Sequence, residues 1–135
     1  NLQVSEDLLS ISVKNIKDRP GQILKNSLIN KLNPEGQRTI KKYNLIVELS
    51  ESKTELGIRK DMSATRTDLE ISVKYILRDI ENSNILLEGN KKSVSSYDVV
   101  ESVYATLVAE KEARKNGINV LSDDIFTDLA IFFKK

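Results

Sequence analysis

Hydrophobic and polar side chains alternate in three stretches of the chain, which is the pattern of a strand with one buried face. The clearest alternation occupies residues 69–77, and a shorter one occupies residues 9–13. The longest begins at Tyr43, pauses at a polar patch, and resumes its phase to about Lys60. We therefore expect one long strand there, with a bulge or irregularity within residues 51–54. Residues 85–99 have a weaker pattern, which predicts a fourth strand broken at residues 89–92.

Two other stretches have the spacing of amphipathic helices. The first opens at residues 18–21 and ends at residues 33–36, because Pro34 cannot continue a helix. Its apolar positions are Leu24, Leu28 and Leu32. The second runs from Ser102, which we expect to cap it, to the end of the chain. Its predicted stripe is Leu107, Ile118, Leu121, Ile125, Leu129 and Phe132, and Gly117 lowers its helix propensity by about 1 kcal/mol.

The order of these elements predicts an α+β fold, β-α-β-β-β-α, in one domain over residues 1–135. The first helix is a connection long enough for parallel pairing of the strands on either side of it. The later strands follow one another as hairpins. We expect both helices to pack on one face of a four-stranded mixed sheet.

Composition removes several classes of function. The 135 residues include no His, Cys or Trp, so the usual zinc, iron and copper ligands and the Ser-His and Cys nucleophiles are missing. With 21 basic and 20 acidic residues, the net charge of +1 argues against a protein that wraps nucleic acid. The five glycines are scattered and form no phosphate-binding loop. The sequence therefore predicts no metal, no cofactor and no nucleic-acid partner.

Paired carboxylates are the chemistry that remains for an enzyme. They occur at Asp123-Asp124 and at Glu110 with Glu112, on the last predicted helix among alternating lysines. Charge runs of this kind are typical of a solvated helix surface, which is the interpretation we favour. A small hydrolase that uses carboxylates stays open as an alternative, and a deep pocket around a carboxyl group with a raised pKa would support it.

Two further features point to binding. Arg59, Lys60 and Arg66 gather at the predicted tip of the longest hairpin, where they could offer cations to a phosphate or carboxylate, although composition alone favours ordinary surface charge. Apolar residues also interrupt the polar phase of the strands, which leaves open a partner on the second face of the sheet. These residues are Ile46, Ile76 and Leu86. The four tyrosines, Tyr43, Tyr75, Tyr97 and Tyr104, are more typical of core or edge packing than of a base-stacking surface.

Several stretches carry a family resemblance. They are residues 19–28 (RPGQILKNSL), 32–34 (LNP) with Gly36, 43–45 (YNL), 56–58 (LGI) and 102–114 (SVYATLVAEKEAR). In this order they resemble the outer-membrane lipopolysaccharide-assembly lipoproteins of the LptE (rare lipoprotein B) family. The resemblance covers nearly the whole chain, and residues 102–114 are similar to a run in alphaproteobacterial members.

The resemblance implies a fold, a partner and a location. Members of this family have two helices on a four-stranded sheet, plug the lumen of the LptD β-barrel, and assist insertion of lipopolysaccharide into the outer leaflet. They are held at the periplasmic side of the outer membrane by lipid on an N-terminal Cys. This chain opens on Asn1 without that Cys, so we expect that a segment before Asn1 was trimmed.

The resemblance also implies a ligand site and a role without catalysis. Basic residues near the hairpin tip contact lipopolysaccharide in the family, and Arg59, Lys60 and Arg66 occupy the comparable region. A second basic position near the start of the last helix has no counterpart in residues 108–110. Beside this interpretation stands a soluble periplasmic adaptor that binds another protein through its sheet.

Overall fold

The structure is a computed structural model that describes residues 5–58 and 65–134, apart from the side chains of residues 57 and 58. Its elements are α1 (Glu6–Leu9), β1 (Ile11–Val13), α2 (Asp18–Leu32), β2 (Tyr43–Ile58), β3 (Thr65–Asp79), β4 (Ile85–Val99) and α3 (Val103–Lys134). The strands form one sheet in the order β1-β2-β3-β4, with β1 parallel to β2 and the other neighbours antiparallel. The predicted α+β fold is confirmed.

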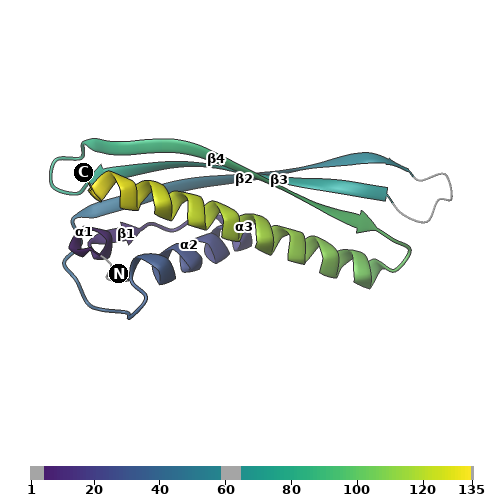
Figure 1. Cartoon of the computed structure of the whole chain (residues 1–135), viewed down its shortest axis with the longest axis horizontal. Coiled ribbons are helices and arrows are strands. Elements are labelled where there is room, and N and C mark those ends of the chain that lie inside the picture. Colours follow the sequence, from purple (N-terminus) through teal and green to yellow (C-terminus); the bar gives the residue numbers. More distant parts are fainter. Residues whose placement is uncertain (1–4, 59–64, 135) are drawn as a thin grey trace.

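Both long helices lie on one face of this sheet, as predicted, but they cover it unequally (Figure 1). The 32 residues of α3 run along most of the sheet, whereas the 15 residues of α2 lie only beside the C-terminal half of α3. The Ser27 hydroxyl of α2 donates to the Ser122 hydroxyl of α3 at 2.8 Å, and Lys31 pairs with Asp123 at 2.7 Å. The other half of α3 and the far half of the β2–β3 hairpin extend beyond α2.

The core lies between the sheet and the two helices. The alternation in β3 is confirmed, because its predicted apolar residues are all at most 2% exposed. Leucines of α2 and the C-terminal half of α3 close the core from the other side. The apolar side chains among the described residues with no exposed surface are Leu24, Leu28, Leu45, Leu69, Leu77, Ile118, Leu121, Ile125 and Leu129. None of the described helices has an apolar stretch long enough to cross a bilayer.

The first predicted strand begins later than expected. Leu9 belongs to α1, a single helical turn, and β1 starts at Ile11. Ser5 caps this turn, since its hydroxyl accepts a hydrogen bond from the Leu8 amide at 3.3 Å. Leu8 is 6% exposed, so the turn adds a residue to the core that the alternation over residues 9–13 did not reveal.

Neither of the two expected breaks in the sheet lies where the sequence predicted it. The β2–β3 register is continuous over residues 43–55, and its shift lies between Glu55 and Ile58. Strand β4 runs unbroken through residues 89–92. Gly89 pairs with Tyr75, whose hydroxyl would lie 2.7 Å from a Cβ at this position. The glycine therefore makes room for the tyrosine ring without ending the strand.

The last helix is continuous, and Ser102 caps it as predicted by accepting a hydrogen bond from the Ala105 amide at 3.1 Å. Two residues at its start were misplaced by the sequence analysis. Leu107 is 58% exposed and does not join the buried stripe, and Tyr104 is 79% exposed and packs neither in the core nor at an edge. Both lie on the half of α3 that α2 does not reach.

Candidate functional site

The predicted basic tip is described only in part. Arg59 and Lys60 lie outside the described residues. Arg66 lies near the start of β3, where its guanidinium donates to the Ser96 hydroxyl at 3.1 Å and stands 3.8 Å from the Asp68 carboxylate. Because the side chain is 62% exposed, water screens this pairing and the cation can still meet an anion.

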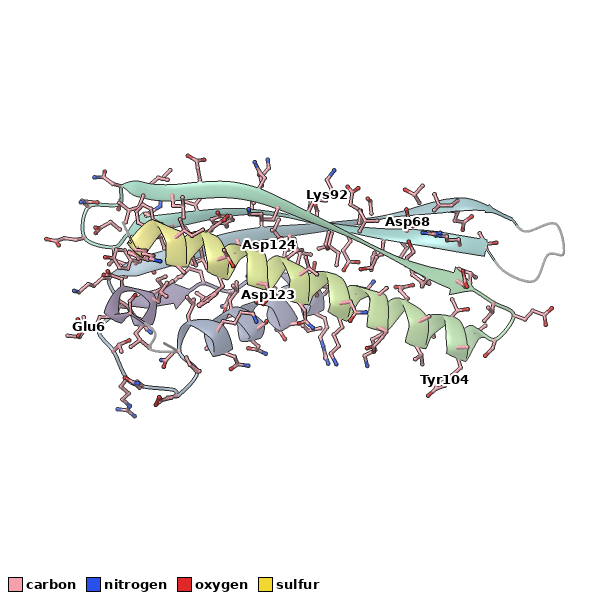
Figure 2. The ribbon with its side chains drawn as sticks, viewed as in Figure 1. Glu6, Asp68, Lys92, Tyr104, Asp123 and Asp124 are labelled. Carbon is pink, nitrogen blue, oxygen red and sulfur yellow. The ribbon has the colours of Figure 1, made fainter. Side chains whose placement is uncertain are left out.

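Two other lysines lie within β4, in the stretch where a break of the strand was expected. Lys91 points to the helix side, where its ammonium lies 3.0 Å from the Asp128 carboxylate. Asp128 also accepts a hydrogen bond from the hydroxyl of Tyr75, so β3, β4 and α3 meet at one carboxylate. Burial and the Asp128 charge raise the pKa of Tyr75, which keeps its hydroxyl protonated. Lys92 lies on the opposite side of the sheet (Figure 2), 3.9 Å from Glu70.

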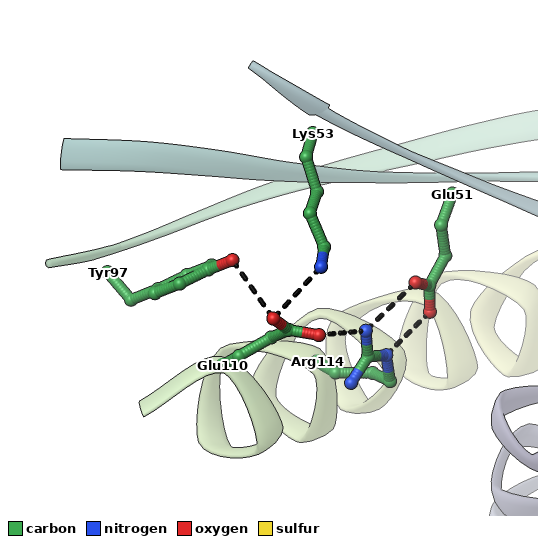
Figure 3. Close-up of polar contacts among 5 residues, drawn as sticks. All are labelled: Glu51, Lys53, Tyr97, Glu110 and Arg114. Carbon is green, nitrogen blue, oxygen red and sulfur yellow. Dashed lines mark hydrogen bonds and ion pairs between the residues drawn. The ribbon is translucent and has the colours of Figure 1, made fainter. Parts of the chain in front are cut away.

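A network of five polar side chains joins the far half of the sheet to α3 (Figure 3). Arg114 donates two hydrogen bonds to Glu51, at 2.7 and 3.1 Å, and a third to Glu110 at 2.8 Å. The other oxygen of Glu110 accepts from Lys53 at 2.9 Å and from Tyr97 at 3.2 Å. Two strands of the sheet and the helix beneath them are therefore tied together by polar contacts, which we call the Arg114 network.

These contacts fix the ionisation of the network. Hydrogen bonds from Arg114 and Lys53 lower the pKa of Glu110 from 4.5 to about 2. The bond to Glu51 raises the pKa of Arg114, and the bond to Glu110 raises that of Lys53. Both charges of each pair are thus stabilised at neutral pH.

The network corrects the interpretation of Glu110 as part of a solvated surface, since its side chain is only 19% exposed. Sequence patterns contained two signals for it. Glu51 and Lys53 occupy the phase of β2 that faces the helix, and Glu110 precedes Arg114 by four residues. The other acidic pair does fit a helix surface, because Asp123 is 67% exposed and pairs with Lys31 (Figure 2).

The face of the sheet away from the helices, which we call the open face, is largely polar. Ile46 is 37% exposed there, and it pairs across strands with Ile76. These two side chains, with charged neighbours such as Glu48, Lys74 and Arg78, line a hollow of about 400 Å³. Leu86 was wrongly expected beside them. It packs against the core, at a register shift between β3 and β4.

A second apolar surface lies at the start of α3. Val103, Tyr104, Leu107 and Val108 are 73%, 79%, 58% and 47% exposed, and we call them the α3 stripe. Their spacing of three and four residues puts them on one side of the helix. Tyr104 projects from the first turn away from the sheet (Figure 2).

Some known proteins are similar to this chain in sequence, and others are similar to it in fold. No protein-family model matches it. The uncharacterized protein RP188 of Rickettsia prowazekii is 32% identical over 132 residues, which cover 96% of this chain and 80% of that protein. The chain belongs to the same family as this rickettsial protein. At that identity and coverage the two members share their fold along nearly the whole chain.

Solved structures extend the family's fold to more distant proteins. A candidate lipoprotein of Caulobacter crescentus has a TM-score of 0.74 at 22% identity, over 93% of this chain and 92% of that one. A minor lipoprotein of Acinetobacter baumannii has a TM-score of 0.69 at 18% identity, over 90% and 91%. Rare lipoprotein B of Shewanella oneidensis has a TM-score of 0.52 at 13% identity, over 90% and 92%. The family therefore has the fold of rare lipoprotein B, the LptE fold.

Proposed function

We propose that this protein is an outer-membrane lipoprotein of the LptE type, which plugs and helps to assemble the LptD β-barrel and so assists insertion of lipopolysaccharide. The observation that carries the proposal is the LptE fold, shared with rare lipoprotein B over nine-tenths of both chains. The stretches that resemble the LptE family in sequence support the same role, and they extend from α2 to the start of α3.

The surface of the chain suits a binding role. One face of the sheet is open along the length of three strands, and it presents small polar residues and charged residues of both signs. The lumen of an outer-membrane barrel is polar, so a polar sheet face is the kind of surface that could lie against it. Within that face, the apolar side chains of Ile46 and Ile76 in the hollow would provide a local anchor.

The proposed role involves no bond chemistry, and the state of the carboxylates supports this. Glu110 has a pKa of about 2, which makes it a poor proton donor at neutral pH. Asp123 is exposed and paired with Lys31. Glu110 therefore lacks the raised pKa that a general acid would need.

Lipopolysaccharide contact belongs to the proposal through the hairpin tip. Arg66 holds an exposed cation beside the open face, and Arg59 and Lys60 are its neighbours in the predicted tip. Cations of this kind pair with phosphates, which lipid A carries, and would compete with the divalent ions that bridge packed lipopolysaccharide.

Co-expression with the LptD barrel of the same organism tests the proposal. We expect the two proteins to leave the membrane as one complex in mild detergent and to stay together through size-exclusion chromatography. An unrelated outer-membrane barrel expressed in the same way is the control and should not retain the chain. Recovery of LptD and this chain as separate species would contradict the proposal.

The lipid anchor is tested in the gene upstream of Asn1. An outer-membrane lipoprotein requires a signal peptide that ends in small residues followed by Cys. We expect that arrangement, and metabolic labelling of the full-length product with a fatty acid should then depend on the Cys. A gene with no such Cys would remove the proposed anchor.

A further inference from the structure

The α3 stripe continues a side of the helix that is buried farther along. Tyr104 lies two and three heptads before Ile118 and Ile125, and residues one heptad apart drift by only about 20° around a helix. Ile118 and Ile125 have no exposed surface, whereas Tyr104 is 79% exposed. The same side of α3 is thus core at one end and uncovered by any described residue at the other.

The element that makes the difference is α2. Its contacts with α3 at Ser122 and Asp123 lie on the C-terminal half, and it begins at Asp18, short of the stripe (Figure 1). The apolar side of α3 therefore continues past the part of the helix that α2 covers. Contiguous exposed apolar side chains of this kind mark interaction sites in soluble proteins. Their helical spacing and the precedent of α2 indicate that the occupant is another helix.

Charges at the two ends of the stripe indicate which helix would bind it. Glu101 lies two residues before Val103, and Lys111 lies three residues after Val108, four residues from Leu107 on the same side of the helix. Both side chains are exposed, and neither has an ion pair within the described residues. Glu112 and Lys115 are also exposed near Lys111, so that end keeps a net positive charge. The stripe therefore has an acidic end, an apolar centre and a net basic end.

We infer that the α3 stripe binds the same stripe of a second copy of this chain, with the two helices antiparallel about a two-fold axis. In that arrangement Glu101 of each copy opposes Lys111 of the partner subunit, so the charges match twice by symmetry. Tyr104 then packs against Leu107 and Val108 of the partner subunit. Four apolar side chains from each copy make a small interface, so the dimer is weak and forms at high local concentration.

This self-association goes beyond the proposed plug role and does not rest on it. Sedimentation equilibrium of the chain tests it between about 10 μM and about 1 mM, where weak interfaces associate. We expect the average mass to rise toward that of a dimer. Leu107→Asp should keep the chain monomeric across the range, because it places a charge at the centre of the stripe.

Ile131→Asp is the matched control, since Ile131 is 54% exposed on α3 but lies far from the stripe. It should dimerise like the unaltered chain, and far-ultraviolet circular dichroism should show both variants folded. A chain that is monomeric at every concentration, or a dimer that survives Leu107→Asp, would overturn the inference.

Charge reversal distinguishes the antiparallel pairing of the two copies from nonspecific apolar association. Lys111→Glu and Glu101→Lys should each weaken the dimer about tenfold, and the double variant should restore it because the opposed charges match again. Failure of the double variant to recover would refute the antiparallel arrangement. Binding of phosphatidylglycerol vesicles that Leu107→Asp abolishes, in a chain that stays monomeric, would assign the stripe to a lipid surface and overturn the inference as well.

Discussion

At the scale of single residues, the Arg114 network stabilises the far half of the β2–β3 hairpin against α3. The far half of the hairpin has one helix beneath it, and polar groups occupy much of the sheet–helix contact there. Charged groups in such a position are costly unless each has its partner. Here every charge is matched, because Arg114 bridges Glu51 and Glu110, and Lys53 binds the free oxygen of Glu110.

Glu110 makes the free energy of unfolding fall at acid pH. Its pKa is about 2 in the folded chain and 4.5 ordinarily, so its contribution is complete above pH 4.5 and disappears as the pH falls toward 2. Glu110→Gln should lower the free energy of unfolding at pH 7 by about 1.5–3 kcal/mol, the range for hydrogen bonds to charged groups. It should also flatten the loss of stability in acid, measured by urea unfolding at several pH values.

Glu112→Gln is the matched control, because Glu112 is exposed on the same helix and is not one of the five residues of the Arg114 network (Figure 3). Its acid profile should follow that of the unaltered protein. An equal effect of the two substitutions would show that general helix charge, and not the network, carries the pH dependence.

At the scale of elements, the sequence was informative where one periodicity extended over many residues. The strict alternation of β3 and the leucines of α2 were placed correctly because each follows from one buried side. Errors arose where a neighbour decides the outcome. Nothing local shows that Leu107 lacks the cover that α2 gives to Ser122, or that Tyr75 requires a glycine opposite it in β4. The Arg114 network likewise depends on the packing of a strand against a helix 57 or more residues away.

The glycine within α3 has a reason of the same kind. A Cβ on Gly117 would lie 2.9 Å from the Ser93 hydroxyl oxygen, which is buried and has no hydrogen-bond partner among the described residues, and 3.2 Å from Ile71. Gly117→Ala alone should therefore destabilise the protein, although alanine favours a helix by about 1 kcal/mol. In a Ser93→Ala background, where the oxygen is gone, we expect part of that loss to be recovered. A thermal-denaturation double-mutant cycle measures the coupling, and purely additive effects would contradict the close contact.

At the scale of the whole molecule, the chain is asymmetric along its length. One end packs two helices on the sheet, whereas the other presents a long hairpin with a single helix (Figure 1). Arg66, the described residue of the predicted ligand-binding tip, and the α3 stripe both belong to the second end. The family resemblance predicted the tip from the sequence, whereas composition alone favoured ordinary surface charge. In the structure Arg66 contacts acidic and polar neighbours.

Charge reversal tests the tip as a ligand site. Changing Arg59, Lys60 and Arg66 to Glu should weaken binding of purified lipopolysaccharide about tenfold or more in isothermal titration, because phosphate pairing is lost. The thermal midpoint should change little, since exposed charges contribute little to stability. The matched control reverses three exposed cations that lie before the start of β2 or at the end of α3, Arg38, Lys42 and Lys134. Equal affinities of the two triple variants would exclude the tip.

The central claim is that this protein works inside or against the LptD barrel, and photo-crosslinking in living cells tests it most directly. A photoreactive amino acid at Ser50, which is exposed in the middle of the open face opposite Ser72, reports what that face touches. The proposed role predicts an ultraviolet-dependent adduct that contains LptD and is absent without the photoreactive residue. Adducts only with other periplasmic proteins, or none while the protein is present at normal levels, would contradict it.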